Sequence, residues 1–123
     1  KHCGCVLVRN KRIIATGYNG SIPGAAHCDD VGHDMHNNHC VRTVHAEANA
    51  VAQAARNGVG LEGASAYINA FPCWPCFKLL ALSGIVAVYF DDDYRNDDRV
   101  RLAAKESQIK LVGPDFWKGG EPI

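Results

Sequence analysis

The chain has 123 residues, of which 47% are hydrophobic and 21% charged, as is typical of one globular domain spanning 1–123. Its 13 basic and 13 acidic side chains balance, which argues against a protein that binds a long phosphate backbone through a basic surface. No run of eighteen apolar residues and no apolar leader is present, so we expect no membrane span, no secretory signal and a cytoplasmic protein.

Cysteine and histidine are unusually frequent, with six of each in this short chain. In a small secreted protein, six cysteines would suggest three disulfides. The high hydrophobic content and the missing leader favour reduced thiols that serve as metal ligands instead.

The first third of the chain predicts a hairpin followed by a long irregular segment. Apolar runs at 5–8 and 13–16, separated by the polar pair Asn10-Lys11, predict two antiparallel strands. Because the first strand begins almost at once, we expect residues upstream of Lys1. From 21 to 42 no periodicity is visible, and a structureless loop of that length is unusual in a compact domain unless something else organises it.

The remainder alternates helices and strands. Thr43 is the expected N-cap of an Ala-rich helix, and Gly58 lies where a helix-ending glycine belongs. The order of elements predicts an α/β fold, a three-layer α/β/α sandwich around a mixed five-stranded sheet with helices on both faces. We expect helices at 44–57, 73–83 and 97–106, and strands at 64–71, 85–90 and 109–112.

Two short motifs carry the chemistry: His45-Ala46-Glu47 and Pro72-Cys73-Trp74-Pro75-Cys76, each at the start of a predicted helix. Cys73 and Cys76 are three residues apart, so both thiols can point the same way, and the helix dipole favours the thiolates that zinc binds. His45 can supply a third ligand. Three protein ligands leave the fourth position of zinc to water, as in catalytic sites.

Glu47 is the predicted proton shuttle of this site. Zinc lowers the pKa of its water from 15.7 to about 7, so that hydroxide can attack C4 of cytosine. Glu47 would accept the water proton and deliver it to the ring nitrogen and the departing amine. Each motif is weak evidence alone, but together they match the H-x-E and P-C-x-x-C signature of zinc deaminases.

Three other functions use parts of the same pattern. Cys73-Trp74-Pro75-Cys76 after a strand also fits a thioredoxin-like redox protein, which leaves His45 and Glu47 unexplained. A zinc-stapled binding module has no need for Glu47. A deaminase that edits tRNA or single-stranded DNA shares the zinc chemistry, but zero net charge and few aromatics among the basic residues argue against it, and against any nucleic-acid partner.

Longer segments of the chain resemble the deoxycytidylate deaminase family between residues 6 and 112. They are Gly-Tyr-Asn-Gly-Ser at 17–21, His-Cys-Asp-Asp at 27–30, His-Cys-Val-Arg-Thr-Val-His-Ala-Glu-Ala-Asn-Ala at 39–50, and Phe-Pro-Cys at 71–73. The resemblance implies a cytidine-deaminase-like fold and hydrolysis of dCMP to dUMP and ammonia, which supplies the dTMP pathway. It also implies a homo-oligomer, often a hexamer, regulated by dCTP and dTTP, with Mg2+ accompanying the triphosphate.

The resemblance also implies roles for individual residues. His45, Cys73 and Cys76 are the expected ligands of the catalytic zinc, with Glu47 as the shuttle. The residues expected to contact substrate are Asn19 at the sugar, Val44 and Phe71 beside the base, Ala46 and Pro72 next to them, and Tyr94 near the sugar-phosphate end. Arg42 and Arg95 are candidates for the phosphate, although each can also be read as a surface charge.

A second, structural zinc is expected in the segment from 21 to 42. Close members of the family have cysteine at the positions of Cys28, His33 and Cys40, and histidine remains a good zinc ligand. The family's fourth cysteine and its N-terminal helix precede residue 1, and its usual Val-Gly-Ala is replaced here by Cys3-Gly4-Cys5. Cys3, Cys5 or an upstream residue is therefore the candidate fourth ligand.

Overall fold

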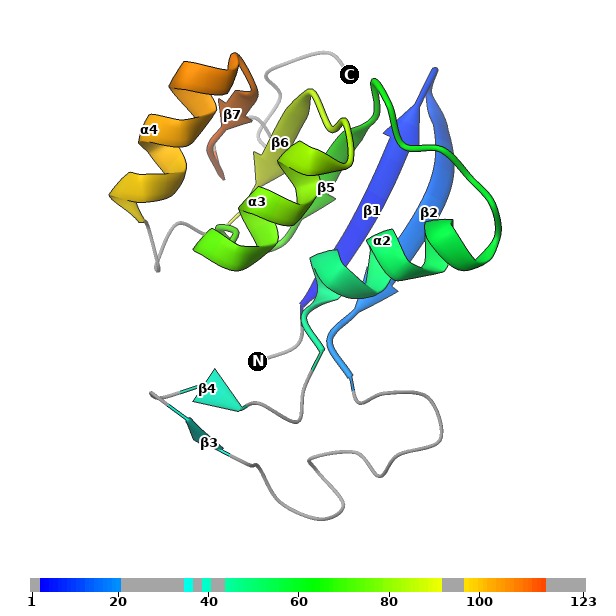
Figure 1. Cartoon of the computed structure of the whole chain (residues 1–123), viewed down its shortest axis with the longest axis horizontal. Helices are drawn as coiled ribbons and strands as arrows, with labels where there is room; N and C mark the ends of the chain where they lie inside the picture. Colours follow the sequence, from blue (N-terminus) through cyan, green and yellow to red (C-terminus); the bar gives the residue numbers. More distant parts are fainter. Residues whose placement is uncertain (1–2, 21–34, 37–38, 41–43, 92–96, 115–123) are drawn as a thin grey trace.

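The computed structural model describes residues 3–20, 35–36, 39–40, 44–91 and 97–114, and only the backbone of 35–36 and 39–40 (Figure 1). The predicted hairpin is confirmed: β1 (Gly4–Arg9) pairs antiparallel with β2 (Arg12–Tyr18). Asn10 and Lys11 join the strands with φ angles of 54° and 62°, the left-handed backbone that tight two-residue hairpin turns require.

The predicted mixed five-stranded sheet is also confirmed, with strand order β2-β1-β5-β6-β7. β1 runs antiparallel to β2 and β5, whereas β5, β6 and β7 are parallel. The bounds are Ser65–Ile68 for β5, Ala87–Phe90 for β6, Lys110–Val112 for β7, Ala46–Arg56 for α2, Trp74–Leu82 for α3 and Asp98–Ser107 for α4.

All three of these helices pack on one face of the sheet (Figure 1). Leu7, Ala66 and Val88 lie next to one another across β1, β5 and β6 and belong to the same core cluster as residues of α2, α3 and α4. For α3 and α4 the reason is topological: β5, β6 and β7 follow one another in one direction, and right-handed crossovers then place the two connecting helices on one side. The second helical layer expected from the sequence is not among the residues that the structure describes.

Several bounds differ from the sequence prediction. α2 begins after His45, not after Thr43, because Val44 has extended backbone and pairs with Gly20. β5 ends at Ile68, short of the predicted 71, and β6 begins at Ala87, later than the predicted 85.

A small hairpin lies in the segment that was expected to be irregular. β3 (Met35–His36) pairs antiparallel with β4 (His39–Cys40). Strands of two residues are too short to show an alternating hydrophobic pattern, so the sequence carries no signal for them.

The start of α2 lies directly against β2. A Cβ atom on Gly17 would come within 2.4 Å of the carbonyl oxygen of Ala46 and of the backbone nitrogen of Ala50, so no larger residue fits there. Two amide side chains of α2 then reach the outer edge of β2: Asn49 donates to the Tyr18 carbonyl (2.7 Å), and Gln53 accepts from the Thr16 N–H (2.8 Å). These contacts fix the position of the helix end that carries His45.

Candidate metal centre

His45 is placed by the junction between β2 and α2. Gly20 and Val44 form an isolated antiparallel bridge, in which the Gly20 N–H donates to the Val44 carbonyl (3.0 Å). His45 follows immediately as the N-cap of α2, with φ −68° and ψ 153°. Its side chain makes no capping hydrogen bond, so the ring is available to face the neighbouring helix.

The two cysteines of the second motif occupy the first turn of α3. Cys73 is the N-cap, with φ −72° and ψ 163°, and Pro75 lies in the first turn, where a missing N–H costs nothing. Cys76 is inside the helix and buried, with an exposed fraction of 5%. The same turn therefore holds one thiol at the helix end and one in the interior.

The structure brings His45, Cys73 and Cys76 together. The His45 Nδ1 atom lies 3.4 Å from each sulfur, and all three donor atoms lie within 4.8 Å of one another. Zinc bound tetrahedrally to one nitrogen at 2.0–2.1 Å and one sulfur at 2.3 Å holds these two atoms about 3.6 Å apart. The donor types and their spacing thus fit a zinc ion, and among the described residues no fourth donor joins the group.

The electrostatics of the two thiols are opposite. The pKa of Cys73 is lowered to about 4, first by the hydrogen bond from the Cys76 thiol and then by the hydrogen bond to His45. The pKa of Cys76 is raised, since its thiol holds the proton that the Cys73 thiolate accepts and is itself desolvated. Burial raises the pKa of the nearby Cys5 to about 12, so that thiol stays protonated.

Glu47 is the buried charged residue of the described core, with an exposed fraction of 6%. Burial raises the pKa of its carboxyl group above the ordinary value of 4.5, and the charge of Cys73 adds to this effect. The carboxylate interacts electrostatically with Cys5, Cys73 and Cys76, and it follows the ligand His45 by two residues in the chain. It is not part of the group of converging metal donors, so it is free to move protons.

Of the other predicted site residues, some are described by the structure and some are not. Asn19 lies beside the start of β1. Its side-chain Oδ1 accepts from the Cys3 N–H (2.9 Å), and its backbone N–H donates to the Cys3 carbonyl (3.1 Å). Ala46, Phe71 and Pro72 are buried next to the ligands in the chain. Cys28, His33, Arg42, Tyr94 and Arg95 lie outside the described residues, as does the side chain of Cys40.

Two features near the site had no signal in the sequence. The alternation of buried and less buried residues along β1 agrees with the burial of Cys5, but it does not predict the electrostatic interaction of Cys5 with Glu47. Trp74, inside the second motif, contacts Arg99 of the distant helix α4. The four described cysteines, Cys3, Cys5, Cys73 and Cys76, form no disulfide.

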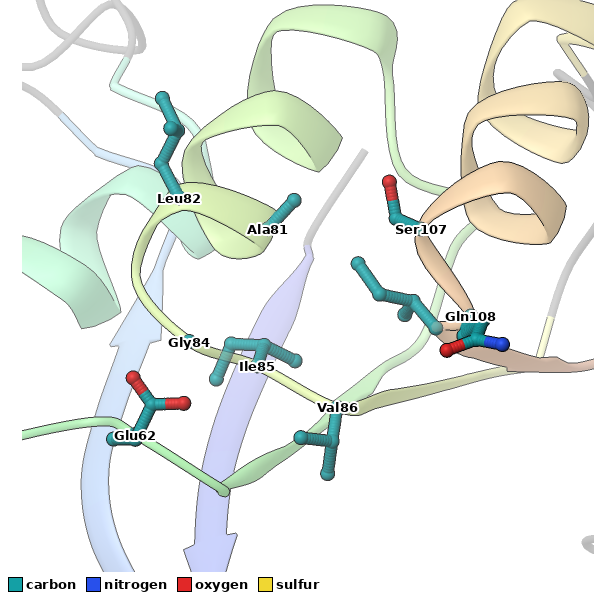
Figure 2. Close-up of a pocket in the computed structure, with 9 residues that line it drawn as sticks. Glu62, Ala81, Leu82, Gly84, Ile85, Val86, Ser107 and Gln108 are labelled. Atoms are coloured by element: carbon teal, nitrogen blue, oxygen red, sulfur yellow. The ribbon is translucent and has the colours of Figure 1, made fainter.

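A shallow hollow of about 370 Å³ lies at the opposite end of α3 from the metal donors (Figure 2). Leu82, Ile85 and Val86 line it together with Glu62 and Gln108. Of the predicted site residues that the structure describes, none contributes to this lining. In the part of the chain that the structure describes, no helix has the length and apolar character to cross a bilayer.

Comparisons with known proteins agree with this geometry. The model of the cytidine and deoxycytidylate deaminase zinc-binding region matches residues 1–91. ComE operon protein 2 of Bacillus subtilis is 48% identical over 92 residues, which cover 75% of this chain and 49% of that protein. Deoxycytidylate deaminase of Saccharomyces cerevisiae is 36% identical over 117 residues, which cover 90% of this chain and 37% of that protein. The chain therefore spans half or less of the length of each of these two relatives.

A solved structure supports the fold. The dCMP deaminase of cyanophage S-TIM5, in complex with dCMP and dUMP, superposes with a TM-score of 0.76 at 24% identity. The match covers 90% of this chain and 79% of the phage protein. The predicted cytidine-deaminase-like fold is therefore confirmed.

Proposed function

Because the chain belongs to the cytidine and deoxycytidylate deaminase family, we propose that it hydrolyses dCMP to dUMP and ammonia. The observation that carries this proposal is the convergence of His45, Cys73 and Cys76 at two helix starts, together with the buried carboxylate of Glu47, which interacts electrostatically with His45 and Cys73. A redox pair or a structural zinc site would have no use for that carboxylate. Relatives named deoxycytidylate deaminase support the choice of substrate.

Each residue then has a defined task. His45, Cys73 and Cys76 would hold zinc, which supplies a water molecule whose pKa is lowered to about 7. Glu47 accepts a proton from that nucleophile and transfers it to the pyrimidine nitrogen and the departing amine. Burial raises the pKa of the Glu47 carboxyl group, which suits a residue that must both accept and release a proton near neutral pH.

The surrounding residues hold the substrate. Val44 and Phe71 flank the base, with Ala46 and Pro72 next to them. Asn19, whose Oδ1 atom accepts from the Cys3 N–H, is proposed to hydrogen-bond the sugar. Tyr94 is proposed to contact the sugar-phosphate end.

A substrate panel tests the proposed function. We expect ammonia release from dCMP to exceed that from deoxycytidine by several orders of magnitude in kcat/KM, because binding energy from the phosphate helps to orient the reacting base. Cytidine and oligonucleotides serve as the comparison substrates. Equal rates on dCMP and deoxycytidine would indicate a nucleoside deaminase, and a preference for oligonucleotides would indicate a polynucleotide deaminase.

Regulation by nucleotides is proposed from the same family membership. We expect a homo-oligomer, with a hexamer favoured, in which dCTP together with Mg2+ activates and dTTP inhibits. Coupled subunits would then give a sigmoidal dependence of rate on dCMP. Hyperbolic kinetics that neither triphosphate changes would contradict this expectation.

A second, structural zinc is proposed at Cys28, His33 and Cys40. Cys5 is a poorer candidate for the fourth ligand, since it is buried in the core and interacts with Glu47 of the first site, which leaves Cys3 or an upstream residue. We expect two zinc ions per chain, with Cys28→Ser losing one and Cys76→Ser losing the other. Metal analysis that finds a single zinc, unaffected by Cys28→Ser, would exclude the second site.

A further inference from the structure

The two aromatic residues that border Cys73 are both covered by arginines of α4. Phe71 lies two residues before Cys73, and Trp74 lies one residue after it. The Arg99 guanidinium is 5.6 Å from the centre of the Trp74 ring, and the Arg101 guanidinium is 5.2 Å from that of Phe71. Both separations are within the range of cation–π attraction.

Each arginine has a second contact. Arg99 forms a two-point pair with Asp97, Nε to Oδ1 at 3.2 Å and Nη2 to Oδ2 at 2.8 Å. Asp97 is the N-cap of α4 and accepts from the Arg99 N–H (2.9 Å). Arg101 also lies 5.9 Å from the ring centre of Phe90, which meets Phe71 edge-on at 4.9 Å.

Cys73 needs this support more than the other thiol does. Cys76 lies within α3 and is buried, so the helix and the core hold it. Cys73 precedes the helix as its N-cap, is only half-buried and makes no side-chain capping hydrogen bond. Besides its contacts with His45 and Cys76, its position therefore depends on the neighbouring residues of the segment 71–74.

We propose that Arg99 and Arg101 are positioning residues for the segment 71–74, which they hold through Trp74 and Phe71 so that Cys73 stays in place to bind metal. Lys78, one turn further along α3, lies 5.1 Å from the centre of the Trp74 ring and supports it from its own helix. In this proposal the arginines act on Cys73 through the two aromatic rings. The effect on zinc binding does not depend on the proposed function, whereas the effect on catalysis rests on it.

The test measures how fast the zinc-loaded protein loses its metal to an excess of a chromogenic chelator. One lost cation–π contact should speed release about two- to fivefold, so we expect this for Arg99→Gln and for Arg101→Gln. In the double variant the two increases in release rate should multiply. Lys105→Gln is the matched control, since it removes an exposed charge from the same helix and should leave the rate unchanged.

Two further variants separate positioning from charge and from general stability. Arg101→Lys keeps the charge but loses the flat guanidinium, so it should release zinc more slowly than Arg101→Gln but faster than the wild type. In a double-mutant cycle, Trp74→Leu combined with Arg99→Gln should release zinc no faster than the faster single variant, because the arginine acts through the indole. Release rates equal to those of Lys105→Gln, or a lowered Tm with unchanged release, would overturn the proposal.

This measurement needs no substrate, so a failure of the proposed dCMP activity leaves its outcome unaffected. If the protein does turn over dCMP, the zinc-saturated Arg101→Gln variant should raise KM more than it lowers kcat, because Phe71 is proposed to flank the base. An unchanged KM together with unchanged zinc release would show that Arg101 is only a surface residue.

Discussion

Replacing Glu47 by Gln is expected to abolish turnover while the zinc content stays unchanged. Glutamine has nearly the same shape but cannot carry a proton between the nucleophile and the base. A positioned proton carrier contributes about 10²- to 10⁴-fold to rate, so kcat should fall by at least that factor. The zinc should remain because Glu47 lies beside the converging donors without belonging to them.

The stability of the same variant provides an independent check. Burial raises the pKa of the Glu47 carboxyl group, so its folded-state value lies above the unfolded value near 4.5. The stability from this shift is present below the unfolded pKa and is lost as pH rises through the folded pKa. At neutral pH the metal-free Glu47→Gln protein should therefore have a Tm no lower than that of the wild type.

Glu106→Gln is the matched control, since Glu106 is an exposed carboxylate on α4 and should be dispensable. Measurements of kcat, metal content and Tm on the three proteins complete the experiment. Retained turnover in Glu47→Gln would remove the proposed mechanism. Loss of zinc in Glu47→Gln would show that the carboxylate is a ligand instead.

The metal centre could be predicted from the sequence because its determinants are local. His45 and Glu47 are two residues apart at one helix start, and Cys73 and Cys76 are three apart at another. Helix geometry alone determines which way such neighbours point. Only the meeting of the two helix starts requires the whole fold, and the alternation of strands and helices predicts it.

The rest depends on contacts between residues far apart in the chain. The two-residue difference at the start of α2 arises from the pairing of Val44 with Gly20 across the intervening segment, which no helix propensity reveals. The placement of α2, α3 and α4 on one face follows from strand order, which the sequence does not specify. The contacts of α4 with Trp74 and Phe71 could not be predicted from the sequence either, because Arg99 and Arg101 have the pattern of an ordinary solvent-exposed helix face.

Removing one thiol ligand should have the second large effect. We expect Cys76→Ser to lose the catalytic zinc and its turnover, because a serine hydroxyl does not ionise near neutral pH as a thiol bound to zinc does. The metal-free fold should tolerate the change, since the hydroxyl can still donate to Cys73 as the Cys76 thiol does.

Zinc-dependent unfolding measures this loss directly. A ligand that binds only the folded state at 100 times its Kd stabilises that state by about 2.7 kcal/mol, so wild-type protein should gain stability as zinc is added. Cys76→Ser should lack the part of this gain that comes from the catalytic site. Cys5→Ala is the matched control: burial raises the pKa of that thiol to about 12, so it stays protonated and its removal should leave the zinc response intact. Full zinc content and turnover in Cys76→Ser, or equal zinc loss in Cys5→Ala, would show that the ligand set is wrong.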